Sequence, residues 1–223
     1  MQKILITLIF LLTTNLATAK PYFDITKINP NLIDPPFAVG DEKWQNEVNL
    51  IIEKQNNFNS EKLSQAALEK DLTPETLTLQ INRNLTRQKY PKLYLLLDRT
   101  GETSYKLTHH FKDHFTITRP YLASNKIKNL IEPSKGYSYP SGHTSGSYIY
   151  AYVLGMVFVD KKTEFMNLAA QIADNRILVG MHYPQDINGG KQLALLAIGA
   201  LTQNKEFLHD LKNARSEVGA IAY

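Results

Sequence analysis

The chain has 223 residues, 43% hydrophobic and 21% charged, which is an ordinary globular composition with enough apolar residues for one domain with a core. Its net charge of +4 comes from Lys and Arg residues spread along the chain, so no basic block of the nucleic-acid-binding kind is present. The absence of cysteine excludes thiol catalysis, zinc–cysteine sites and iron–sulfur clusters.

The beginning of the chain predicts a secretory signal peptide over residues 1–19. Lys3 gives a basic start, Ile4 to Leu12 is an apolar run, and Ala17-Thr18-Ala19 offers a small-x-small cleavage pattern. Cleavage after Ala19 would make the protein periplasmic or secreted. An uncleaved membrane anchor is the alternative, but the apolar run is short for a span of about 20 residues.

We expect no stable membrane insertion further along the chain. The two most apolar later stretches are too short to span a bilayer and predict buried helices instead. They are Tyr148–Val159 and Leu193–Leu201.

Residues 20–42 predict an extended N-terminal arm, and residues 43–223 predict a single all-α domain. The arm is rich in Pro, Asn and Asp. Helical spacing of apolar residues, capping side chains and Pro at first helical positions then predict successive helices, whereas 121–140 is expected to be mostly irregular. The predicted helices are Trp44–Gln55, Ser60 to about Asp71, one starting after Thr73, one opened by Pro91, Tyr105–Phe115, Gly142–Val159, Glu164–Ile177, Asp186–Leu201 and Glu206–Ser216.

Two groups of polar residues lie near predicted helix ends. Lys112 and Arg119 are seven positions apart, a spacing that would place both cations on one helical face, although two such cations usually form a solvated face. Pro120 also biases Arg119 toward an extended conformation, which would end the helix there and direct the guanidinium inward. In Pro140-Ser141-Gly142-His143, a hydroxyl and free amides at a helix start form an anion site, beside which His143 could donate a proton. A Ser-capped helix with a structural histidine is the alternative for this second group.

The third group is Arg176, His182 and Asp186. A continuous helix would scatter these side chains, but Gly180 and Pro184 supply a break that could let them converge. Asp186 is near enough in sequence to bond one ring nitrogen of His182 and leave the other as a free lone pair, which is the logic of a catalytic dyad.

Together the three groups resemble the signature of the type 2 phosphatidic acid phosphatase (PAP2) superfamily: Lys-x6-Arg-Pro, then Pro-Ser-Gly-His, then Ser-Arg-x5-His-x3-Asp. Order and spacing agree throughout, with Asn175 in place of the usual Ser before Arg176. The signal peptide, the chain length and the arm are most similar to bacterial class A non-specific acid phosphatases. The resemblance implies an all-α, single-domain helical bundle of the PAP2/vanadium haloperoxidase type.

The resemblance also implies an activity: metal-independent hydrolysis of phosphate monoesters through a phosphohistidine. His182 would be the nucleophile, Asp186 its orienting carboxylate, and His143 the acid that protonates the leaving group. Phosphate would be bound by Lys112, Arg119, Ser141, Gly142 and Arg176. No cofactor and no nucleic acid is implied; the expected partners are small phosphomonoesters, with a homodimer or larger homo-oligomer as a possibility.

Three alternatives stay open. A vanadium-dependent haloperoxidase shares the anion-binding motifs but is generally much larger, and a membrane lipid phosphatase would need spanning helices. A catalytically silent phosphate- or phospholipid-binding protein would not need His143, His182 and Asp186. The spacing of His110 and His114 could suit a metal on a helix face, but no third ligand accompanies them, so we expect them to be structural or surface residues.

Overall fold

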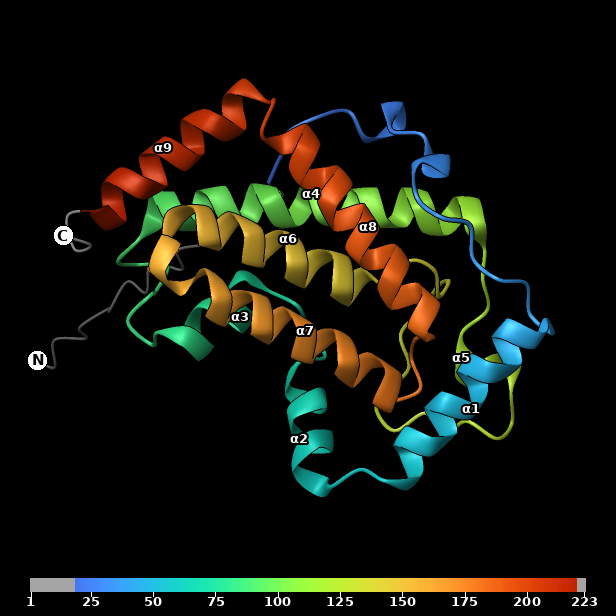
Figure 1. Ribbon diagram of the computed structural model, residues 1–223. Coiled ribbons are helices and arrows are strands. Elements are labelled where there is room, and N and C mark those ends of the chain that lie inside the picture. Colours follow the sequence, from blue (N-terminus) through green and yellow to red (C-terminus); the bar gives the residue numbers. More distant parts are fainter. Residues whose placement is uncertain (1–18, 220–223) are drawn as a thin grey trace, which may run out of the picture.

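The computed structural model describes residues 19–219, so the predicted signal peptide up to residue 18 lies outside the described residues. Every regular element in this range is a helix, which confirms the all-α prediction (Figure 1). The α-helices are α1 Glu42–Asn56, α2 Ser60–Leu68, α3 Pro74–Ile81, α4 Pro91–Phe115, α5 Pro120–Ala123, α6 Gly142–Val157, α7 Lys162–Leu178, α8 Pro184–Leu201 and α9 Lys205–Gly219; the 3-10 helices are η1 Ile25–Lys27, η2 Pro30–Leu32 and η3 Val159–Lys161.

Helix α6 lies at the centre of the bundle. It packs against α4, α7, α8 and α9, and Figure 1 shows it between the long α4 and α7. A helix surrounded in this way must be apolar or small on nearly all sides, and the sequence from Ser145 to Val157 meets that condition. Its first residues, which carry the Pro-Ser-Gly-His motif, are thereby fixed against α4 and α8.

Helix α4 is one continuous helix of 25 residues, so the prediction of separate helices opened by Pro91 and at Tyr105–Phe115 was wrong. Gly101 lies in its interior, where glycine costs helix stability. A Cβ at Gly101 would lie 2.1 Å from the hydroxyl oxygen of Tyr150, so glycine is needed for the close approach of α6. The close packing of Tyr150 against α4 therefore explains why a glycine stands in the middle of this helix.

Lys112 and Arg119 do not share a helical face, whereas the expected extended conformation of Arg119 before Pro120 is confirmed. Helix α4 ends at Phe115, and Thr116 adopts a left-handed conformation with φ of 54°. Arg119 is extended and precedes Pro120, the first residue of α5. The chain therefore turns back after α4, and Arg119 reaches the same cavity as Lys112 from the following loop.

The connection between α7 and α8 is a tight turn. Gly180 has φ of +76°, and a Cβ there would lie 2.4 Å from the carbonyl oxygen of Lys128, so both the conformation and the space require glycine. Pro184 is the first residue of α8, not part of the break as expected. The turn places His182 two residues before the start of α8, and Asp186 lies in the first turn of that helix.

Helix α1 covers the start of α8 from outside. Trp44, Val48 and Ile51 of α1 form an apolar cluster with Tyr183 and Ile187. The arm that precedes α1 contains η1 and η2 and lies against α4. None of the helices between residues 19 and 219 combines the length and apolarity needed to cross a membrane.

We predict that Phe165→Ala in α7 lowers the free energy of unfolding by about 3–5 kcal/mol, because the fully buried ring leaves a cavity in the main apolar cluster. Leu195→Ala in α8 is the matched control, since its side chain is 58% exposed and its loss should cost little. Urea unfolding of both variants checks this. Equal losses would contradict the assignment of the core.

Candidate active site

A cavity of about 410 Å³ is lined by the stretch of α4 from Gly101 to Asp113, the start of α6 and the end of α7. Its lining combines cations and histidines with apolar groups. Six of the eight predicted site residues line it: Lys112, Arg119, Gly142, His143, Arg176 and His182. The fold thus brings together three motifs that are spread over the 75 residues from Lys112 to Asp186.

His182 and Asp186 form the predicted pair. Nδ1 of His182 lies 3.1 Å from Oδ2 of Asp186, and both side chains are buried. A carboxylate only accepts hydrogen bonds, so Nδ1 carries the proton and Nε2 is the lone-pair nitrogen. Nε2 lies 3.3 Å from Nη1 of Arg119, on the cavity side of the ring. The lone pair of Nε2 therefore faces Arg119 and accepts from its guanidinium.

Asp186 is held by two further donors. The hydroxyl of Ser138 and the main-chain N–H of Tyr183, at 2.9 Å, both donate to Oδ2, the oxygen that accepts from His182. Burial raises the pKa of Asp186 to about 6, whereas these donors and the nearby Lys112 lower it. Ser138 was not predicted as a site residue; its position just before the Tyr-Pro-Ser-Gly-His run was its only signal.

The surroundings keep the His182 ring neutral. Burial, followed by the charges of Arg119 and Lys112, holds the pKa of His182 well below its usual value. The ring thus keeps a lone pair even in mildly acidic solution. A neutral imidazole with one nitrogen fixed by a carboxylate is the arrangement that a nucleophilic histidine needs.

Main-chain carbonyls hold two of the cations. Nζ of Lys112 donates to the carbonyls of Tyr137 and Ser138, at 2.6 and 2.7 Å. Arg119 donates to the carbonyls of Gly136 and Met181, both at 3.1 Å. Carbonyl dipoles orient the cations without cancelling their charge, so the cavity stays positive and suits an anion.

The burial of Lys112 lowers the affinity of its amine for a proton. Burial, and then the charge of Arg119, lower the pKa of Lys112 to about 7, and Asp186 opposes them. An anion bound in the cavity acts in the same direction as Asp186. Binding of an anion near neutral pH therefore takes up a proton.

His143, the second residue of α6, lines the same cavity as His182 and contacts the chain just after α2. Its Nε2 is 3.1 Å from the carbonyl oxygen of Glu69 and 2.9 Å from that of Lys70. Carbonyls only accept, so Nε2 carries a proton and Nδ1 is left for a ligand. Burial, and then Arg176, lower the pKa of His143 to about 4, whereas the two carbonyls raise it.

Gly142 and Ser141 of the Pro-Ser-Gly-His segment lie differently with respect to the cavity. Gly142 lines the cavity at the start of α6, where main-chain N–H groups are free. Ser141 is fully buried and caps α6 by accepting from the N–H of Thr144. It is not among the residues that line the cavity. Phosphate binding by Ser141 stays a prediction.

Arg176 of α7 reaches the cavity with a buried acidic partner that the sequence analysis missed. Its Nη2 donates to the carbonyl of Ala66 at 2.6 Å and lies 3.4 Å from Oε2 of Glu69. Glu69 belongs to no motif and lies more than a hundred positions away, so only the fold reveals this contact. Asn175, the departure from the family motif, also contacts Glu69.

The other histidines that raised a metal question lie outside the cavity. Nε2 of His110 contacts the carbonyl of Ile28 at 3.1 Å, and His114 stacks edge-on against Phe115. Among residues 19–219 no group of three His, Asp or Glu side chains is arranged to hold a metal ion.

Comparison with known proteins places the three motifs in a familiar sequence context. Residues 100–209, about half of the chain, match the profile of the PAP2 superfamily. A non-specific acid phosphatase of Providencia stuartii is 26% identical over 195 residues, which cover 83% of this chain and 79% of the relative. An acid phosphatase of Zymomonas mobilis subsp. mobilis is 27% identical over 139 residues, 60% of this chain and 53% of the relative.

Among solved structures, a bacterial vanadium-dependent iodoperoxidase is similar, with a TM-score of 0.59 and 18% sequence identity. The alignment covers 75% of this chain and 52% of the peroxidase chain. At this identity the likeness shows the fold, and it confirms the helical bundle of the PAP2/vanadium haloperoxidase type.

We predict that sulfate, a dianion throughout this range, binds more weakly as the pH rises from 6.5 to 8.5. The loss should approach about tenfold per pH unit above 7, because free Lys112 loses its proton there. Lys112→Arg keeps its charge, so its affinity should vary much less with pH. Isothermal titration calorimetry measures both; equal pH dependence in the two proteins would contradict the assignment to Lys112.

Proposed function

The chain is a phosphatase of the PAP2 superfamily, and from this premise we propose that it hydrolyses phosphate monoesters through a phosphohistidine on His182, without a metal ion. One observation carries the proposal: the buried His182 has Nδ1 fixed by Asp186 and Nε2 directed toward Arg119 in a cationic cavity. An uncharged nucleophile beside cations suits attack on an anionic phosphorus centre.

In the first step, Nε2 of His182 attacks phosphorus, an N–P bond forms and the bond to the ester oxygen breaks. His143 gives the proton on Nδ1 to the leaving oxygen. Asp186 retains the hydrogen bond to Nδ1 of His182 and stabilises the positive charge that develops on that ring. In the second step, neutral His143 takes a proton from water, which cleaves the N–P bond and releases phosphate.

The cations supply most of the charge stabilisation. Phosphoryl transfer is chiefly positioning and electrostatics, so Lys112, Arg119 and Arg176 can take the place that metal ions have in other phosphatases. The N–H of Gly142 and the hydroxyl of Ser141 are proposed as further donors. The phosphoryl dianion opposes the burial and the Arg176 charge that lower the pKa of His143, and so helps this ring keep its proton.

The names of the relatives favour hydrolysis over halide oxidation. Proteins named as acid phosphatases align with most of this chain, whereas the iodoperoxidase shares the fold at low identity. A silent anion-binding protein would gain nothing from the His182–Asp186 pair, since cations alone bind an anion. We propose small phosphomonoesters as substrates and, from the predicted signal peptide, a periplasmic or secreted location.

Turnover of p-nitrophenyl phosphate in EDTA tests the proposal. We expect full activity, because the described cations cover the phosphoryl charge. Activity that disappears in EDTA and returns with a divalent ion would contradict metal independence. Oxidation of halide by vanadate and peroxide, without hydrolysis of phosphate esters, would favour the peroxidase alternative.

We also predict that His143→Ala depends on the leaving group. Loss of a general acid should lower kcat/KM by about 10²–10⁴-fold for alkyl phosphates, and much less for p-nitrophenyl phosphate, whose leaving group needs little protonation. His114→Ala, an exposed histidine at the end of α4, is the control and should act like the parent protein. Equal losses for both ester types would remove His143 from its role as acid.

A further inference from the structure

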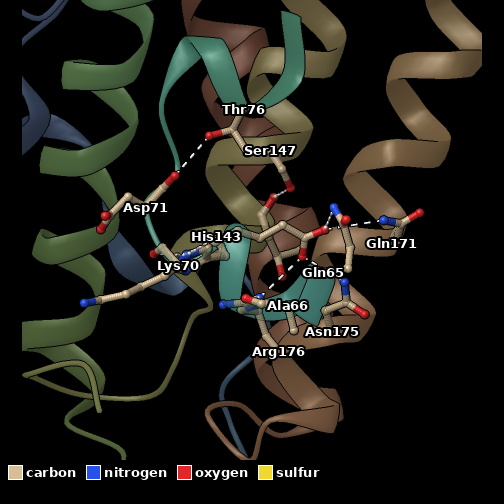
Figure 2. Close-up of polar contacts among 12 residues, drawn as sticks. Gln65, Ala66, Lys70, Asp71, Thr76, His143, Ser147, Gln171, Asn175 and Arg176 are labelled. Carbon is tan, nitrogen blue, oxygen red and sulfur yellow. Dashed lines mark hydrogen bonds and ion pairs between the residues drawn. The ribbon is translucent and has the colours of Figure 1, made fainter. Parts of the chain in front are cut away.

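The end of α2 meets both the proposed acid and one of the phosphate-binding cations. Figure 2 shows His143 directed toward Lys70, and Arg176 directed toward Ala66, at adjacent points of this segment. Glu69 lies between these two contact points in sequence and is fully buried. No step of the proposed mechanism uses Glu69, so its burial needs a reason.

The carboxylate of Glu69 is surrounded by donors. Oε2 accepts from Nδ2 of Asn175 at 2.8 Å and faces Nη2 of Arg176 at 3.4 Å. Oε1 faces the side-chain amides of Gln65 and Gln171, at 3.0 and 3.4 Å. A buried carboxylate is costly unless it is compensated in this way, and Arg176 is the only cation in contact with it in the described structure.

This contact fixes one nitrogen of the Arg176 guanidinium. Nη2 is occupied by Glu69 and by the carbonyl of Ala66, whereas the buried Nε has no hydrogen-bond partner among the described residues. Arg176 lines the cavity. Glu69 and the carbonyl of Ala66 thus fix one end of a guanidinium whose residue lines the cavity.

The main chain of the same residue holds His143. The carbonyl oxygens of Glu69 and Lys70 both accept from Nε2 of His143, which directs Nδ1 away from α2. These carbonyls lie just beyond the C-terminal end of α2, where the helix dipole favours a positive ring. Glu69 therefore contacts Arg176 with its side chain and His143 with its backbone.

Asn175 is part of the same arrangement. The family motif usually has Ser before the arginine, and a Ser hydroxyl is shorter than the amide that reaches Glu69 here. The 2.8 Å bond from Asn175 orients Oε2 beside Arg176. The departure from the motif is thus matched to the acidic residue on α2.

From these contacts we infer that Glu69 is a positioning residue, which fixes the guanidinium of Arg176 for the phosphoryl group and is itself oriented by Asn175. The inference rests on the proposed phosphatase function. It makes α2, a helix without any catalytic motif, a structural part of the active site.

The test is a double-mutant cycle of Glu69→Gln and Arg176→Met, with kcat, KM and vanadate inhibition measured on p-nitrophenyl phosphate. Glu69→Gln keeps the shape but removes the charge partner of Arg176. We expect kcat to fall by about tenfold and vanadate inhibition to weaken similarly, with a smaller change in KM, since the transition state needs Arg176 most. In the Arg176→Met background the same change should cost less than about twofold.

Glu61→Gln is the matched control, because Glu61 is exposed in the first turn of α2 and its loss changes the net charge equally. It should leave kcat unchanged. Equal losses from Glu69→Gln in both backgrounds, or a lower melting temperature with unchanged kcat and unchanged vanadate inhibition, would overturn the inference.

Asn175→Ala provides a second variant should Glu69→Gln fail to fold. It leaves both charges in place and removes only the amide that orients Glu69, so we expect kcat to fall by several-fold, about threefold or more. Unchanged kcat in Asn175→Ala would overturn the inference. A parent protein without any phosphatase activity would instead refute the proposed function, so the two failures are distinguishable.

Discussion

The burial of three cations is the constraint on which the rest of the site depends. Lys112, Arg119 and Arg176 are only 7%, 4% and 1% exposed, although charged side chains are rarely buried without compensation. Main-chain carbonyls compensate the first two, and the Glu69 carboxylate together with the carbonyl of Ala66 compensates the third. Carbonyl dipoles stabilise a cation without neutralising it, so a positive potential remains in the cavity.

That potential explains the behaviour of the other titratable groups. It keeps His182 neutral, together with burial, and it offsets part of the burial that raises the pKa of Asp186. Burial, and then the charge of Arg119, lower the pKa of Lys112 to about 7. The same charges that bind a phosphoryl group therefore prepare the nucleophile that attacks it.

The fold supplies these charges from helix ends that converge around α6. The left-handed Thr116 ends α4 and returns the chain toward the cavity, and Gly180 makes the turn that carries His182 to the start of α8. Both turns are short, so little chain separates the catalytic side chains from rigid helices. Positioning of this kind is what phosphoryl transfer requires.

Much of this could be predicted from the sequence, because the motifs have fixed internal spacing. The helical class, the convergence of Lys112, His143 and His182, and the His182–Asp186 pair all follow from local patterns or from the family resemblance. Continuity of α4 through Gly101 could not be predicted, since it depends on the close approach of Tyr150 from another helix.

Glu69 could not be predicted as part of the site for a similar reason. It is a single acidic residue just after a short helix, and an isolated glutamate in such a position is usually solvated. Only the packing of α2 on α7 brings it to Arg176 and Asn175. Ser138 was overlooked because a serine before a proline-rich turn has no pattern that distinguishes a carboxylate partner from a loop residue.

The most direct test of this account is the chemical identity of the phosphorylated enzyme. Rapid acid-free quenching during turnover of p-nitrophenyl phosphate, followed by peptide mass spectrometry, should find an acid-labile, base-stable phosphoramidate on His182. It should form at least as fast as turnover and be absent from His182→Ala. Phosphate on another residue, or turnover by a single displacement with inversion at phosphorus and no phosphoenzyme, would contradict the central role of His182.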